Sequence, residues 1–152
     1  MAARALSADD IAFGRAVLLA TDSLGMNAEG AFWLYDTRER KWRYFLITSL
    51  FNTLGSREIY LRLNRVLAKK LSEREARKFQ VFMGGPNESL VRAIGATVST
   101  NAHSSDPQRV AVTLDREKTR AIVYRLASAA ADREVRRAKR RFLAASKELL
   151  AA

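Results

Sequence analysis

Two aromatic-rich segments on either side of a short charged stretch are the feature that most constrains the fold. Residues 31–35 read Ala-Phe-Trp-Leu-Tyr, and residues 42–47 read Trp-Arg-Tyr-Phe-Leu-Ile. Aromatic and β-branched residues favour strands, and the polar residues 36–41 are typical of a turn. The pattern therefore predicts a β-hairpin. Because aromatic residues occupy both alternating sets of positions, we expect helices to cover one face of the sheet and partly shield the other.

A second hairpin is expected near the C-terminal end of the chain. Residues 110–114 and 122–126 both alternate apolar and smaller or polar residues. The five residues 115–119 would connect them. A helix over residues 116–127 is the competing interpretation. Two further short strands are expected at residues 79–83 and 97–100.

Helices are expected before, between and after these strands. Ser7 followed three residues later by Asp10 resembles a capping box, and Gly25 offers a stop. Asn87 is the expected cap of a short helix that ends at Gly95. Apolar residues at helical spacing complete the pattern. The expected helices cover about residues 8–24, 57–71, 88–95 and 129 to the end.

This order of elements predicts an α+β fold with a largely antiparallel sheet, flanking helices and a basic C-terminal helix. The chain has 152 residues, which suits one domain. We expect a compact α+β unit over residues 1–128, followed by the basic helix over residues 129–152. The terminal helix carries a narrow apolar seam of Val135, Ala138, Phe142, Ala145 and Leu149.

The terminal helix also holds the densest charge in the chain. Residues 136–141 read Arg-Arg-Ala-Lys-Arg-Arg, and the whole chain has 27 Lys and Arg against 16 Asp and Glu, a formal net charge of +11. Such an excess favours a polyanionic partner such as nucleic acid or an acidic protein surface. An arginine-rich surface of purely compositional origin is the alternative.

The acidic residues of the first turn do not predict an active site. Asp36, Glu39 and Lys41 supply the residue types that a metal-dependent nuclease uses to bind magnesium and activate water. All three lie in one tight turn, where they face solvent and cannot converge on one metal ion. A nuclease-like or phosphate-handling enzyme that uses scattered acids such as Asp36 and Asp115 is therefore kept only as a second alternative.

The remaining polar motifs predict turns. The only histidine, His103, lies near serine and aspartate in residues 101–107, but three sequence neighbours rarely form a catalytic triad. Asx and Ser turns explain that segment. Residues 84–87, Gly-Gly-Pro-Asn, lack the lysine and spacing of nucleotide-binding loops. The chain has no cysteine, which excludes disulfides, thiolate catalysis and cysteine-based zinc or iron–sulfur sites. Since none of these motifs indicates an active site, we predict no catalytic residues, no metal site and no cofactor.

Four segments resemble parts of small bacterial proteins of uncharacterised function. They are residues 31–35, 42–44, 55–60 and 120–126. The resemblance covers roughly residues 25–127 and omits the basic helix. It implies a compact bacterial α+β domain and no particular activity.

The sequence therefore predicts a small cytoplasmic binding protein, more consistent with a non-enzymatic role, that contacts a polyanion, preferentially nucleic acid. The alternative is a protein-interaction or oligomeric subunit that docks through its C-terminal helix. No signal-peptide pattern or long apolar run points to a membrane. The predicted contact residues are Arg136, Arg137, Lys139, Arg140 and Arg141, with Arg62, Arg65 and Lys69 as a second patch if the two helices share a face.

Overall fold

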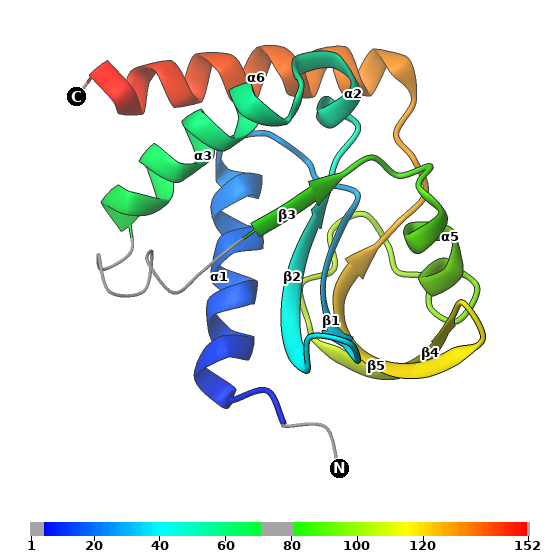
Figure 1. Cartoon of the computed structure of the whole chain (residues 1–152). Coiled ribbons are helices and arrows are strands. Elements are labelled where there is room, and N and C mark those ends of the chain that lie inside the picture. The colour runs from blue at the N-terminus through cyan, green and yellow to red at the C-terminus, as the bar shows by residue number, and fades with distance from the viewer. Residues whose placement is uncertain (1–4, 71–80, 152) are drawn as a thin grey trace.

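A five-stranded sheet in the order β3-β2-β1-β5-β4 forms the centre of the fold (Figure 1). A computed structural model describes residues 5–70 and 81–151. Only the β2–β3 pair is parallel, and the other neighbouring strands are antiparallel. The expected α+β class with a largely antiparallel sheet is confirmed. The strands are β1 Gly30–Asp36, β2 Lys41–Ile47, β3 Val81–Gly84, β4 Gln108–Leu114 and β5 Glu117–Leu126.

The helices lie around this sheet and at its upper end (Figure 1). The first helix begins as the sequence predicts, because the Ser7 side chain accepts a hydrogen bond from the Asp10 N–H at 3.1 Å. It ends before Gly25, which adopts a φ of 76°. The helices of the described chain are α1 Ala8–Ser23, α2 Leu50–Leu54, α3 Ser56–Lys70, α5 Ser89–Gly95 and α6 Asp132–Ala151.

Both predicted hairpins are confirmed, but the second has a shorter connection than expected. In the first hairpin Trp33 pairs with Tyr44 across β1 and β2. In the second, only Asp115 and Arg116 separate β4 from β5, with φ values of 47° and 69°. Two consecutive left-handed residues are typical of the type I′ turn, whose twist matches that of the strands. The five-residue connection and the competing helix over 116–127 are therefore wrong.

Two local predictions in the segment before β4 are also wrong. Residues 97–100 form no strand. Thr100 donates its N–H to the Leu126 carbonyl at 2.8 Å, but its hydroxyl replaces a backbone carbonyl in accepting the Leu126 N–H. A backbone ladder therefore does not continue. Asn87 is not a helix cap, because Glu88 occupies that position after a turn closed by the Glu88 N–H on the Gly85 carbonyl.

The predicted strand at 79–83 is found as β3, two residues later at its start. Phe79 and Gln80 lie outside the described residues. β3 adds to the edge of β2 in parallel, with Tyr44 opposite Val81. The parallel pairing requires the chain to cross over from β2, and α2 and α3 lie within that connection.

The double-sided aromatic pattern predicts one face covered by helices and one partly shielded face, and the sheet carries a hydrophobic core on each face. On one face Trp33, Tyr44 and Tyr124 pack against α1, where the Tyr44 hydroxyl donates to the Gly14 carbonyl at 2.9 Å. The Trp33 Nε1–H donates to the Tyr124 hydroxyl at 3.0 Å. On the other face, buried side chains that include Phe32 form a second cluster with α5. These aromatic side chains are core residues.

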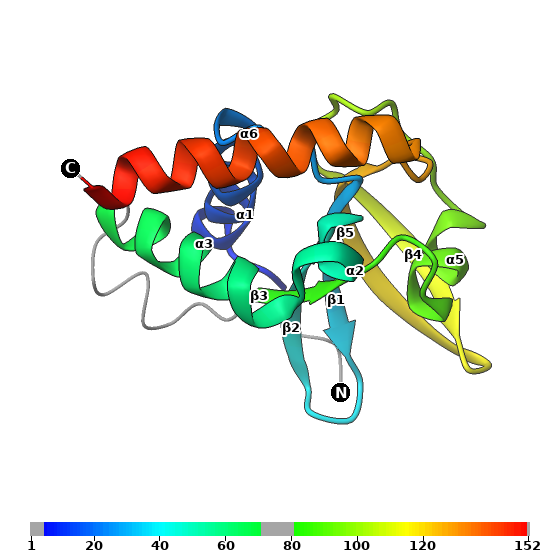
Figure 2. The ribbon, with the colours of Figure 1, turned by 90° about the horizontal axis from the view of Figure 1, so that it is seen from above.

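The apolar seam of α6 is part of the first of these cores. Ala138 and Phe142 are buried in the cluster that also contains the α1 and β1 residues, and Val135 and Ala145 pack against it. Leu149 has no described side chain. The helix packs beside α3 and α2, and Figure 2 shows α6 running alongside α3. Within the described ranges, no helix is long and apolar enough to cross a bilayer.

Candidate nucleic-acid interface and adjoining cavity

The surface of α6 opposite its seam is a cationic ridge, which we define as the exposed basic residues of this helix. Burial of the seam leaves the intervening positions pointing outward, because side chains three and four residues apart share a helix face. Lys139 is half-buried at the edge of the ridge. The ridge consists of Arg133, Arg136, Arg137, Arg140, Arg141 and Lys147.

The ridge has no acidic partner in the described part of the chain. None of its residues takes part in an ion pair there, and the four ion pairs found involve other arginines. Arg136 and Arg140, like Arg137 and Arg141, are separated by four residues, a spacing at which like charges destabilise a helix. Among the described residues this arrangement of charge is therefore repulsive, and a bound anion would relieve the repulsion.

The predicted second patch on α3 is only partly available. α3 and α6 do lie side by side, but Arg62 is used to join them. Its guanidinium donates to the Glu58 carboxylate at 2.7 Å and to the Ser146 hydroxyl at 2.8 Å. Arg65 is exposed. Lys69 belongs to α3, and its side chain lies outside the described residues. Arg62 is therefore a structural contact between the two helices.

A cavity of about 540 Å³ opens beside the ridge. Its walls come from the segment before β1, the start of α2, the loop before β4 and the first turns of α6. Arg137 and Arg141 line it and also belong to the ridge. Apolar and small residues form much of the remaining wall. The lining residues are Met26, Asn27, Ala28, Glu29, Ser49, Leu50, Ala102, His103, Ala127, Ser128, Ala129, Ala130, Ala131, Glu134, Val135, Arg137, Ala138 and Arg141.

Glu29 is the one carboxylate of this cavity that is buried. The residue is 6% exposed. Its oxygens accept the Ser49 N–H at 3.1 and 3.2 Å, and the Ser49 hydroxyl also donates to Oε2. Among the described residues, no Lys or Arg forms an ion pair with it. Burial raises the pKa of the Glu29 carboxyl, and the hydrogen bonds from Ser49 oppose that shift.

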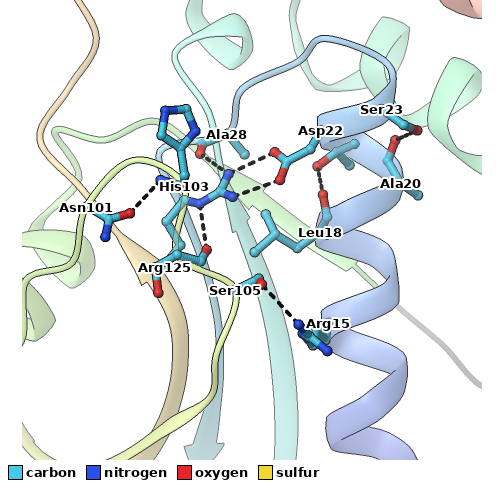
Figure 3. Close-up of polar contacts among 12 residues, drawn as sticks. Arg15, Leu18, Ala20, Asp22, Ser23, Ala28, Asn101, His103, Ser105 and Arg125 are labelled. Carbon is cyan, nitrogen blue, oxygen red and sulfur yellow. Dashed lines mark hydrogen bonds and ion pairs between the residues drawn. The ribbon is translucent and has the colours of Figure 1, made fainter.

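A buried arginine holds the walls of the cavity together (Figure 3). Arg125 is 1% exposed and makes a two-pronged ion pair with Asp22 of α1, at 2.9 and 2.8 Å. The same guanidinium donates to the carbonyls of Ala28 and Ser104 at 3.1 and 2.9 Å. Arg125 therefore fixes α1, the residue before Glu29 and the loop before β4 relative to one another.

His103 lies on that loop and is exposed at the cavity wall. Its backbone N–H donates to the Asn101 side-chain oxygen at 2.9 Å, which is the Asx turn that the sequence predicts. Ser105 accepts a hydrogen bond from Arg15 at 3.5 Å, and Asp106 lies 3.8 Å from the same guanidinium. The serine and the aspartate near His103 are thus directed to α1.

The acidic turn of the first hairpin is also structural. Asp36 accepts the N–H groups of Arg38 and Glu39 at 2.9 and 3.2 Å and pairs with Arg43 at 3.0 Å. These contacts, the Glu39 N–H first, lower the pKa of the Asp36 carboxyl. Asp36 and Asp115 line one shallow cavity of about 280 Å³. Among the described residues, no cluster of three or more His, Asp or Glu side chains is arranged to hold a metal ion.

Comparison with known proteins adds no family. The chain matches no protein-family model, and it shows no significant similarity to a curated protein or a solved structure. Charge, burial and geometry therefore provide the evidence on what this protein binds.

Proposed function

We propose that this protein is a non-enzymatic nucleic-acid-binding protein that contacts the phosphate backbone through the cationic ridge of α6. The observation that supports the proposal is the set of six exposed cations on one helix without an ion-pair partner in the described chain. These side chains would displace the counterions that are condensed around the phosphates, and the release of those counterions supplies favourable entropy. Such contacts carry little sequence information by themselves.

The core packing of α6 favours this use of the helix over docking through its seam. Ala138 and Phe142 are 5% and 0% exposed, so the seam already has an apolar neighbour within the protein. A protein partner of α6 would have to bind the ridge instead, and it would need an acidic surface. Nucleic acid supplies a regular row of negative charge at the spacing of successive phosphates, which suits a continuous helical ridge.

Two matched pairs of substitutions test the proposal. Arg136→Gln with Arg140→Gln removes two charges from the ridge, and Arg109→Gln with Arg120→Gln removes two exposed charges from β4 and β5. Fluorescence anisotropy of a labelled single strand measures the affinity at low salt. We expect the ridge pair to weaken binding by about 10-fold or more and the sheet pair by much less.

Equal losses from the two pairs would contradict the proposal, because they would mean that net charge and not the ridge determines affinity. Binding to an acidic polypeptide of matched length, with no binding to nucleic acid, would instead support the docking alternative. Circular dichroism of each variant verifies that both pairs leave the helical content unchanged.

A further inference from the structure

The cavity beside the cationic ridge has the volume and the lining of a ligand site. Contact with phosphates alone would not require such a cavity. We propose that it binds one unstacked base of a single strand, and that it prefers a base carrying an amino group. The inference rests on the proposed nucleic-acid function and goes beyond it, because it assigns base recognition to the residues around Glu29.

The cavity is continuous with the ridge. Arg137 and Arg141 line it and are also exposed on α6, four residues apart and one helical turn from each other. A strand whose phosphates contact these two arginines would pass directly over the opening. A base attached to that backbone could then turn inward, as bases do when proteins read single-stranded nucleic acid.

The dimensions of the cavity suit such a ligand. Its volume of about 540 Å³ falls within the range of small-molecule sites, which run from roughly 300 to 1,000 Å³. Met26, Leu50 and Val135 provide apolar surface in its walls. Apolar contacts of this kind can replace part of the stacking that a base loses when it leaves the strand.

The single buried carboxylate determines the preference. An ionised Glu29 can only accept hydrogen bonds, and its two oxygens offer about four acceptor positions. The Ser49 N–H, shared between the two oxygens at 3.2 and 3.1 Å, the Ser49 hydroxyl and the N–H of Glu29 itself are the donors it already has. The carboxylate can therefore accept one further donor. Cytosine presents its N4 amino group there, and carboxylates accept from that group in known readout. Uracil presents a carbonyl oxygen at the same position, which a carboxylate repels.

Ser49 and Arg125 would keep this carboxylate in place. The serine binds both oxygens of Glu29, and Arg125 holds the carbonyl of Ala28, the preceding residue, at 3.1 Å. A hydrogen-bond acceptor fixed in this way loses little entropy when a base arrives. Burial also makes an unsatisfied or mismatched contact costly, and this is the basis of discrimination.

The test compares three labelled strands of about 12 nucleotides with the same backbone charge: oligo(dC), oligo(dU) and an abasic strand. The bases of oligo(dC) and oligo(dU) are both pyrimidines of similar size, so the two strands differ mainly in the hydrogen-bonding groups of their bases. We expect wild-type protein to bind oligo(dC) about 3- to 10-fold more tightly than oligo(dU), the effect of one hydrogen bond. The abasic strand should bind most weakly while keeping the salt dependence of a phosphate contact.

Two variants and a matched control locate the preference in the cavity. Glu29→Gln replaces the acceptor by a group that can donate as well, so it should reduce the difference between oligo(dC) and oligo(dU). Ser128→Trp places a large side chain at the exposed lining, and Ser99→Trp makes the same change at an exposed position outside it. Ser128→Trp should abolish the preference for oligo(dC), and Ser99→Trp should keep it.

The outcomes separate this inference from the proposed function. Salt-dependent binding with equal affinity for all three strands would overturn the base site and leave the ridge proposal standing. No binding to any strand would overturn both. The comparison of strands with wild-type protein needs no substitution, so it decides the question even if a cavity variant fails to fold.

Discussion

Replacement of Arg125 by methionine should destabilise the protein more than any other change to a charged side chain of the described chain. Arg125 is 1% exposed and donates to Asp22, Ala28 and Ser104. Methionine can replace the aliphatic part of the arginine side chain, but it is shorter and has no donor. The substitution therefore keeps much of the packing while it leaves a carboxylate and two carbonyl groups without their partner.

The size of the effect follows from what remains uncompensated. Removal of one member of a buried ion pair typically costs about 3–5 kcal/mol. The Asp22 side chain is 29% exposed, so water can recover part of its solvation. The carbonyls of Ala28 and Ser104 lose their Arg125 donor at the same time. We expect a loss near the lower end of that range, about 3 kcal/mol.

Urea unfolding monitored by circular dichroism measures this loss from the shift of the midpoint. Arg120→Met is the matched control, because Arg120 is exposed on the same strand and should lose less than about 0.5 kcal/mol. A loss below about 1 kcal/mol for Arg125→Met, or equal losses for the two variants, would refute the view that this guanidinium joins three segments of the fold.

Three other substitutions test separate parts of the structure. Gly14→Ala would place a Cβ 2.5 Å from the Tyr124 hydroxyl and 2.6 Å from Trp33 Nε1, so it should lower stability by about 1–2 kcal/mol despite a better helix propensity; a melting temperature at or above wild type would contradict this packing. Phe142→Ala should cost about 3–5 kcal/mol in urea unfolding, because the side chain is 0% exposed, and a loss below 1 kcal/mol would mean that α6 is not part of the core. Glu29→Gln tests the raised pKa of Glu29: the contribution of the native carboxyl to stability is full below the ordinary value of 4.5 and is lost as pH rises through its higher folded pKa. The unfolding free energy of the Gln variant relative to wild type should therefore increase with pH across that interval and then stay constant, whereas a difference that does not vary with pH would contradict the shift.

Local patterns predicted the elements whose stability comes from their own residues. The aromatic segments on either side of residues 36–41 predicted the first hairpin, because one set of alternating side chains packs on each core. Ser7 marked the start of α1 through its side-chain hydrogen bond. The seam spacing of Ala138 and Phe142 predicted the helical form of α6 and the face that is buried.

The errors occur where the structure depends on contacts distant in sequence. Asp115 and Arg116 both adopt left-handed backbone conformations. Glycine, the usual sequence signal of such a two-residue turn, is missing, so the sequence favoured a longer connection. The five-residue helix α2 was missed because it is too short to show a period. The isolated Glu29 belongs to no motif, and its burial depends on Ser49, which lies twenty residues further along the chain.

The candidate site follows the same division. Charge density alone identified the α6 cations as candidates, because a run of cations can be recognised in the sequence without knowledge of the fold. Arg62 belonged to the same pattern, yet its contacts with Glu58 and Ser146 place it between two helices. The cavity could not be predicted, because it forms where the segment before β1, the start of α2 and the start of α6 meet. Arg125 gave no signal either, since its partner Asp22 lies on α1.

The salt dependence of single-strand binding tests the central claim most directly. The affinity of wild-type protein and of the Arg136→Gln, Arg140→Gln variant would be measured between about 50 and 200 mM salt. If the ridge neutralises phosphates, log affinity falls linearly with log salt concentration, and the slope of the variant is shallower by about 1.4, or 0.7 for each lost contact. A slope near zero for wild type, or the same slope for both proteins, would contradict the account.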